Sequence, residues 1–128
     1  VLLGQATVHE FVTRGLFEPN LERVVGLLRA RRDAMLAALD RELPGVRTTR
    51  PEGGYFLWLD LAEGSDTPSL LAEAKAEDVA FVAGPDFMIE GGENSLRLSF
   101  ASVPPEQIPE GVSRIATALE RIRATAAA

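Results

Sequence analysis

Two hydrophobic spacings alternate along this chain of 128 residues, and together they restrict its fold more than any other feature. Near the C-terminus, apolar residues recur at spacings of four, three, four and three; these are Ile108, Val112, Ile115, Leu119 and Ile122. This spacing is typical of a helix with one apolar face, which has to be buried against another element. Other short segments are apolar at every position or at every second position, which is typical of strands. The chain therefore has to form a sheet on which helices pack.

A long helical stripe precedes the strands. It is expected to begin at Asn20, which is a good N-cap, and to end at the stop signal Leu43-Pro44-Gly45. Arg31 and Arg32 interrupt the stripe where another apolar side chain would be expected. The apolar positions of residues 1–18 suggest one or two further short helices.

Strand-like segments occupy the middle of the chain. The four expected strands are residues 46–50, 55–59, 79–82 and 96–101. The second of them follows a glycine-rich turn and is apolar on both alternating faces, which predicts a strand covered on both sides. A helix is expected between the second and third strands, because Thr67-Pro68 is a standard start signal and the apolar spacing continues to about Glu77.

The order of these elements predicts an α+β domain. We expect a small mixed sheet of about four strands, with helices layered on one side and a long helix before it. The length of the chain is near the usual size of one domain, and it is sufficient for one hydrophobic core but not for two.

Composition excludes several classes of function. The formal net charge is −6, so the chain has no basic surface for nucleic acid or for an anionic membrane. It contains no cysteine, which excludes a disulfide framework and a thiolate metal site. No stretch approaches the roughly 20 apolar residues of a membrane helix, and no signal-peptide layout opens the chain. We therefore expect no nucleic-acid partner, no membrane and a cytoplasmic location.

Arg97 is the residue most informative about chemistry. In the strand 96–101 it alternates with Leu96, Leu98 and Phe100, and its own face otherwise carries small side chains. A planar, permanently charged guanidinium can bind a carboxylate through two parallel hydrogen bonds. The residues alone leave a plainer alternative open and favour it, namely an arginine that is solvated or paired with a nearby acid such as Asp60.

The other candidate groups predict no catalytic, cofactor-binding or metal site. His9 is the only histidine and has no nucleophile beside it in the sequence. The acidic residues Asp86, Glu90 and Glu93 lack the alternating oxygen ligands of a calcium loop. The glycine pairs match no phosphate-binding spacing. The aromatic residues of 55–59 are expected in the core rather than on a ligand-stacking surface.

Several segments in order resemble the small domain of class I/II, fold-type-I aminotransferases. The segments that carry the resemblance are 31–39 (RRDAMLAAL), 51–59 (PEGGYFLWL), 82–87 (VAGPDF), 94–101 (NSLRLSFA) and 105–115 (PEQIPEGVSRI). Ala83 departs from the family, which usually has proline there, whereas Gly84 matches. The resemblance implies that residues 1–19 are the end of the large domain or its linker, and that 20–128 are the small domain.

The same resemblance implies a function for the parent protein. The arginine of the LRLSFA segment pairs with the substrate α-carboxylate in this family, so Arg97 is implied as a substrate-binding residue, and Phe56 as a possible substrate contact. The parent would use pyridoxal 5'-phosphate to transfer an amino group between an amino acid and a 2-oxo acid, and it would be a homodimer. The family's Schiff-base lysine belongs to a serine–lysine motif that is absent here, and Lys75 has no such context. The chain alone is therefore expected to be inactive.

Two other functions remain open. An aminotransferase-like effector domain of a transcription regulator would have the same small domain, and only the sequence before this segment would separate it from an enzyme. A free-standing binding domain without a cofactor is the second alternative, and a stable, cofactor-free monomer would favour it.

Overall fold

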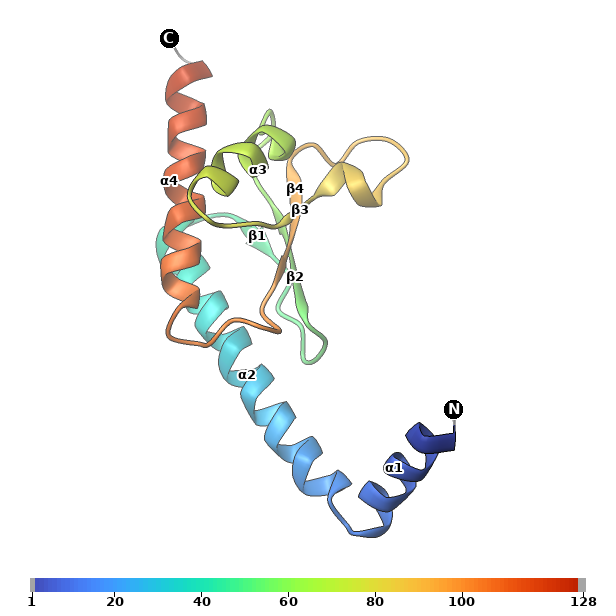
Figure 1. Ribbon diagram of the computed structural model, residues 1–128. Helices are drawn as coiled ribbons and strands as arrows, with labels where there is room; N and C mark the ends of the chain where they lie inside the picture. Colours follow the sequence, from blue (N-terminus) through green and yellow to red (C-terminus); the bar gives the residue numbers. More distant parts are fainter. Residues whose placement is uncertain (1, 127–128) are drawn as a thin grey trace.

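The structure is a computed structural model that describes residues 2–126 (Figure 1). It contains four α-helices, one 3-10 helix and four strands within that range. In chain order these are α1 (Leu2–Thr13), α2 (Phe17–Glu42), β1 (Arg47–Thr48), β2 (Phe56–Asp60), α3 (Thr67–Ala76), β3 (Val82–Ala83), η1 (Gly84–Phe87), β4 (Ser95–Ser99) and α4 (Ile108–Ala126). The predicted α+β class, the number of strands and the preceding long helix are confirmed, but the third strand consists of Val82 and Ala83 and overlaps the expected segment 79–82 only at Val82.

The four strands form one sheet in the order β1-β2-β4-β3, and every neighbouring pair is antiparallel. The expectation of a mixed sheet was therefore wrong in this detail. The crossover through α3 does make β2 and β3 parallel to each other. However, β4 inserts between them and runs antiparallel to both, so no two parallel strands are neighbours.

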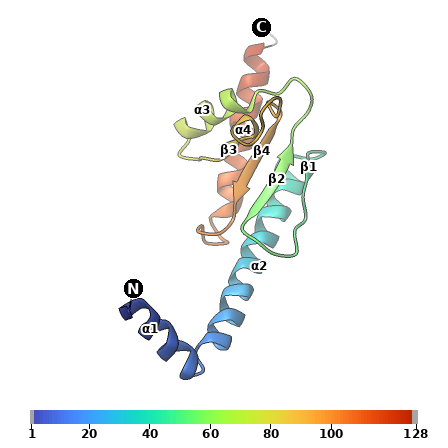
Figure 2. The same ribbon diagram turned by 90° about the vertical axis from the view of Figure 1, so that its right-hand side faces the viewer.

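The helices α2, α3 and α4 cover one face of the sheet (Figures 1 and 2). The core lies between these layers, and its members with no exposed surface include Leu57, Leu59, Leu70, Leu96 and Ala118. The apolar stripe that predicted α4 faces this core, with Val112 and Ile115 each 2% exposed. Among residues 2–126, no α-helix covers the other face of the sheet (Figure 2), so the prediction that 55–59 is covered on both sides was wrong.

Two of the predicted helix starts are shifted. The long helix α2 begins at Phe17 rather than at Asn20, and the Asn20 side chain accepts a hydrogen bond from Arg23 instead of capping the helix. In α3 the cap is Asp66, one residue before the expected Thr67. Its carboxylate accepts a hydrogen bond from the Ser69 amide, which would otherwise lack a partner.

The two arginines that interrupt the apolar stripe of α2 have a structural role. Arg31 donates a hydrogen bond to the carbonyl of Ala101, just after β4. Arg32 donates to the carbonyl of Pro51, at a distance of 3.0 Å, in the turn that leads into β2. These side chains therefore connect α2 to segments that flank the two central strands, which an apolar residue could not do.

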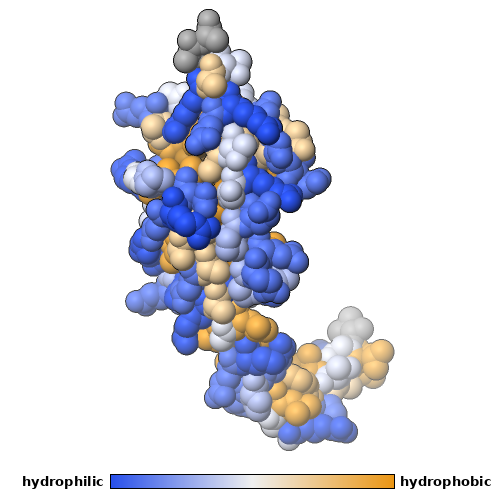
Figure 3. Space-filling view, turned by 90° about the vertical axis from the view of Figure 1, so that its left-hand side faces the viewer, coloured by the Kyte–Doolittle hydropathy of each residue, from blue (hydrophilic) through white to orange (hydrophobic). Residues whose placement is uncertain are grey.

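The first part of the chain projects away from the sheet (Figure 1). None of the residues of α1 is buried. Apolar side chains are exposed along α1 and the first turns of α2, and Figure 3 shows them gathered on the projecting segment; they include Leu2, Leu3, Val8, Phe17 and Leu21. The division into 1–19 and 20–128 remains a prediction. Within residues 2–126, no helix is both long enough and apolar enough to cross a membrane.

Candidate functional site

The uncovered face of the sheet brings the predicted site residues together. Three side chains of β2 and three of β4 point to this face and form cross-strand pairs; the pairs are Phe56 with Ser99, Trp58 with Arg97, and Asp60 with Ser95. The alternate residues of both strands point into the core, as the strand pattern at Arg97 predicted. Arg97 and Phe56 therefore lie on the same surface, one pair apart.

Arg97 is partly buried between aromatic side chains. Its guanidinium carbon lies 4.0 Å from the centre of the Phe56 ring and 4.5 Å from that of Phe87. Contacts of this kind between a guanidinium and an aromatic face stabilise by about 0.5–1 kcal/mol at exposed sites and by more when they are desolvated. The expectation of small neighbours holds for β4 itself, where these are Ser95 and Ser99, but β2 and η1 bring aromatic rings to the guanidinium.

The guanidinium has no acidic partner among residues 2–126, since no hydrogen bond or ion pair of the Arg97 side chain is found there. Its Nε atom is buried and lacks an acceptor. An unsatisfied buried donor costs about 1–3 kcal/mol, more for a charged group. A guanidinium held in this way is suited to donate hydrogen bonds to an external anion.

Asp60, the expected alternative partner of Arg97, is engaged elsewhere. Its Oδ1 accepts hydrogen bonds from the Ser95 hydroxyl at 2.8 Å and from Trp58 Nε1 at 3.0 Å. Its Oδ2 lies 3.6 Å from the Arg47 guanidinium, which is largely exposed. Of the two plainer alternatives for Arg97, the ion pair with Asp60 is therefore not formed among residues 2–126.

Phe87 reaches Arg97 from a loop that the sequence did not associate with the site. The ring of Phe87 makes an edge-to-face contact with Trp58, with ring centres 5.6 Å apart and an interplanar angle of 72°. The loop folds back because Gly84 lies directly against Gly92. A Cβ at Gly84 would lie only 2.3 Å from the Gly92 carbonyl oxygen. The match of Gly84 to the family segment 82–87 was the available signal for this geometry.

The prediction that the aromatic residues of 55–59 lie in the core was wrong. Tyr55 and Phe56 are 52% and 43% exposed, and Trp58 is partly buried on the open face. The core positions of this segment are occupied by Leu57 and Leu59. Phe56 and Trp58 instead lie on the open face of the sheet, where Phe56 contacts the Arg97 guanidinium and Trp58 is its cross-strand partner.

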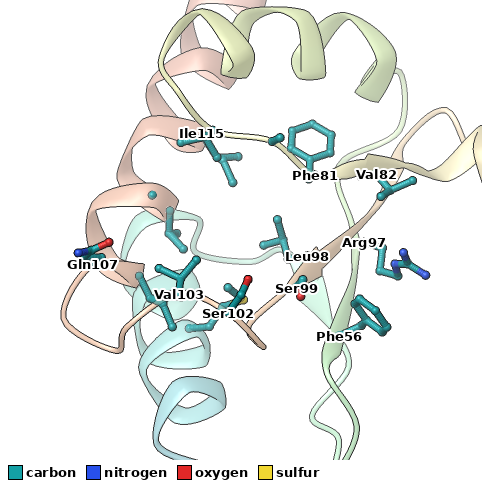
Figure 4. Close-up of a pocket in the computed structure, with 16 residues that line it drawn as sticks. Phe56, Phe81, Val82, Arg97, Leu98, Ser99, Ser102, Val103, Gln107 and Ile115 are labelled. Carbon is teal, nitrogen blue, oxygen red and sulfur yellow. The ribbon is translucent and has the colours of Figure 1, made fainter. Parts of the chain in front are cut away.

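A cleft of about 330 Å³ adjoins Arg97 at the edge of the sheet. In the described part of the chain β3 pairs with β4 at Arg97 and Leu96 alone, so the rest of that edge has no strand beside it there, and the cleft lies at this position. Phe56, Arg97 and Ser99 line the cleft from the sheet, while Gln107 and Ile115 line it from the helical side (Figure 4). Arg97 and Phe56 are therefore among the residues that line this cleft.

The other candidate residues lie apart from this surface. His9 is exposed on α1, far from the sheet along α2 (Figure 1). Lys75 is exposed on α3, in the helical layer, whereas Arg97 projects from the opposite face of the sheet. Within residues 2–126, no three His, Cys, Asp or Glu side chains are grouped so that they could hold a metal ion.

Comparison with known proteins gives a consistent result. The family described as "Aminotransferase class I and II" matches residues 3–115 of this chain. A 2-aminoadipate transaminase of Thermus thermophilus is 48% identical over 125 residues, which are 96% of this chain and 31% of that protein. A similar solved structure is that of LysN, an α-aminoadipate aminotransferase of Thermus thermophilus, complexed with N-(5'-phosphopyridoxyl)-L-leucine. It superimposes with a TM-score of 0.83 and 48% sequence identity, and the match covers 92% of this chain and 31% of LysN.

One similar protein is named a transcriptional regulator rather than an aminotransferase. The HTH-type transcriptional regulator TauR of Rhodobacter capsulatus is 31% identical over 117 residues, which are 90% of this chain and 24% of that protein. In every one of these three comparisons, the chain spans less than a third of the length of the relative it matches.

Proposed function

Because this chain belongs to the class I and II aminotransferase family, we propose that it is the C-terminal part of a pyridoxal-phosphate-dependent transaminase in which Arg97 binds the substrate α-carboxylate. One observation carries the proposal: the Arg97 guanidinium lies beside two aromatic rings and has no acidic partner among the described residues. A substrate carboxylate would supply the missing acceptor. Phe56 lines the same cleft and would contact the bound substrate.

Arginine fits this role better than lysine would. Its planar fork can donate two parallel hydrogen bonds to one carboxylate, which fixes the direction as well as the position of the substrate. The two ring contacts limit the motion of the guanidinium before substrate binds. A group that is already ordered loses less conformational entropy on binding, so more of the interaction energy is available for orientation.

The residues of this chain do not fit the cofactor itself. Pyridoxal phosphate needs a lysine for its Schiff base, and Lys75 lies in the helical layer on the side of the sheet opposite to Arg97. We therefore propose that the 128-residue chain orients substrate but does not transaminate, and that residues outside it hold the cofactor. The complete protein is proposed to be a homodimer, as the family resemblance implies, and to be cytoplasmic, as the sequence led us to expect.

The proposed reaction transfers an amino group between an amino acid and a 2-oxo acid. The relative at 48% identity is named a 2-aminoadipate transaminase, so 2-aminoadipate is the first donor to assay. The test uses the full-length protein with Arg97→Lys and Arg97→Ala. Loss of a charge-assisted, bidentate interaction of about 1.5–3 kcal/mol should raise the Michaelis constant at least tenfold in Arg97→Ala. Arg97→Lys should recover only part of this loss. Unchanged Michaelis constants in both variants would refute the assignment.

The resemblance to regulators supports a second candidate. TauR and this chain share 31% identity over nearly the whole segment, so an effector domain of a transcription regulator would use the same Arg97 surface to bind an amino acid. Transaminase activity of the full-length protein would favour the enzyme. Sequence-specific DNA binding, without transamination, would favour the regulator.

A further inference from the structure

Asp60 and Arg97 are neighbours on the open face of the sheet, so the Asp60 carboxylate could compete with a ligand for the Arg97 guanidinium. Asp60 is paired with Ser95, and Arg97 with Trp58, so the two charged residues are diagonal neighbours across β2 and β4. Side chains at diagonal positions of an antiparallel pair are about 7–8 Å apart at their backbones, within reach of a long side chain. An arginine beside an aspartate would ordinarily form an ion pair. This one does not.

Two neutral donors bind the Asp60 Oδ1 atom instead, while Oδ2 lies 3.6 Å from the exposed Arg47 guanidinium. The Ser95 hydroxyl donates to Oδ1 at 2.8 Å, and the Trp58 indole donates to the same oxygen at 3.0 Å. Ser95 is only 5% exposed, so its hydroxyl has little access to water as an alternative. Trp58 lies opposite Arg97 and also touches Phe87, which in turn contacts the guanidinium. The indole of Trp58 therefore contacts both the Asp60 carboxylate and the Phe87 ring that lies against Arg97.

We propose that Trp58 and Ser95 are positioning residues that hold Asp60 away from Arg97, and so keep the guanidinium free for the carboxylate of the substrate. This inference rests on the proposed function, because it presumes that Arg97 binds that carboxylate. Once released, the Asp60 carboxylate would be an internal competitor. A group attached to the same scaffold has an effective concentration of millimolar or more, so it competes well with a free substrate.

Trp58→Phe in the full-length enzyme tests the proposal. Phenylalanine keeps an aromatic ring beside Phe87 but has no N–H for Asp60. Ser95 and Arg47 still contact Asp60 in this variant, but loss of one hydrogen bond to a charged group should weaken the hold on the carboxylate and raise the Michaelis constant for the amino-acid donor up to about tenfold, with kcat changed much less. Ser95→Ala removes the other donor and should act in the same direction. Together the two variants test the role of the hydrogen bonds rather than the size of the indole.

Restoring the Michaelis constant with a second substitution, at Asp60, distinguishes the positioning role of Trp58 and Ser95 from a merely structural one. Asp60→Asn removes the competing charge, so Trp58→Phe/Asp60→Asn and Ser95→Ala/Asp60→Asn should return the Michaelis constant to roughly the wild-type value. Asp40→Asn is the matched control, because Asp40 pairs with Arg50 far from the sheet face and its change should rescue neither variant. A structural defect at Trp58 or Ser95 would instead be additive with Asp60→Asn.

The outcomes separate this proposal from the one it rests on. If Arg97→Ala leaves the Michaelis constant unchanged, the carboxylate assignment of Arg97 fails. If Arg97→Ala raises it but Asp60→Asn rescues neither Trp58→Phe nor Ser95→Ala, the positioning role of Trp58 and Ser95 fails alone. Rescue by Asp60→Asn together with no rescue by Asp40→Asn supports it. Thermal unfolding of each variant, with the wild-type melting temperature retained, confirms that the kinetic comparison is made on folded protein.

Discussion

Substituting Gly84 with alanine tests whether the loop that places Phe87 beside Arg97 depends on a close approach of two backbone segments. An added Cβ would lie 2.3 Å from the Gly92 carbonyl oxygen and 2.7 Å from that of Ser95. Ordinary van der Waals contacts begin near 3.4 Å, so about 1 Å of space is missing. Both obstacles are main-chain atoms, and no side-chain rotation can relieve the overlap.

The strain should appear both in stability and in binding. Overpacking of a well-packed position costs about 1–3 kcal/mol, and we expect Gly84→Ala to lower the free energy of unfolding by an amount in this range. The loop can relieve the overlap only by moving, and Phe87 lies three residues after Gly84 at the end of η1. We therefore also expect weaker contact between Phe87 and Arg97, and a higher Michaelis constant in the full-length protein.

Gly26→Ala is the matched control for this experiment. Gly26 lies within α2, and a Cβ there would meet nothing within 4 Å. Replacing a helical glycine by alanine should stabilise by about 0.8–1.0 kcal/mol, so the same chemical change is expected to have the opposite sign. Urea unfolding of the 128-residue chain, followed by far-UV circular dichroism, gives both values. Equal or greater stability of Gly84→Ala, with Gly26→Ala behaving as expected, would refute the close approach of Gly84 and Gly92.

Two further predictions concern a cap and a ring contact. Asp66→Ala removes the acceptor for the Ser69 amide at the start of α3 and should destabilise the chain by about 1 kcal/mol in the same urea experiment, whereas Asp66→Asn should keep most of the cap. Phe87→Ala removes a ring whose centre lies 4.5 Å from the Arg97 guanidinium carbon. The contact is worth about 0.5–1 kcal/mol, so the Michaelis constant of the full-length protein should rise a few-fold. Phe87→Tyr keeps the ring and should leave the Michaelis constant near the wild-type value. A Michaelis constant unaffected by Phe87→Ala would show that the contact does not order Arg97.

The sequence predicted the elements more reliably than their pairing. Helical spacing located α4, and alternation at residues 96–101 assigned the two faces of β4 correctly, because both signals depend on local geometry alone. The antiparallel order of the sheet is a property of the whole chain, since β4 has to insert between β2 and β3. The start of α2 was missed because Asn20 resembles a cap, whereas the helix already begins at Phe17.

Residues of the candidate site could be named in advance where a sequence motif contains them, but not where the fold brings them together. Arg97 and Phe56 were identified from segments that resemble a known family, and the structure places them together. Trp58 and Asp60 could have been found by pairing β2 with β4, which sets them opposite Arg97 and Ser95. Phe87 could not have been found in this way. Its position depends on a loop that returns to the sheet through the contact between Gly84 and Gly92.

The other arginines show why Arg97 is distinctive in a chain whose bases are almost all arginine. Four arginines of the described residues are partly buried: Arg31, Arg32, Arg97 and Arg114. The first two and the last each donate a hydrogen bond to a main-chain carbonyl, of Ala101, Pro51 and Glu77 respectively. These three side chains connect segments of the fold, and their burial is offset by those bonds. Arg97 is also partly buried, and like the Nε of Arg31 its Nε atom is buried without an acceptor. Arg31 still donates to Ala101 through another nitrogen, whereas no hydrogen bond of the Arg97 side chain is found within residues 2–126, so Arg97 differs from the other three in having a guanidinium that the described part of the fold does not use.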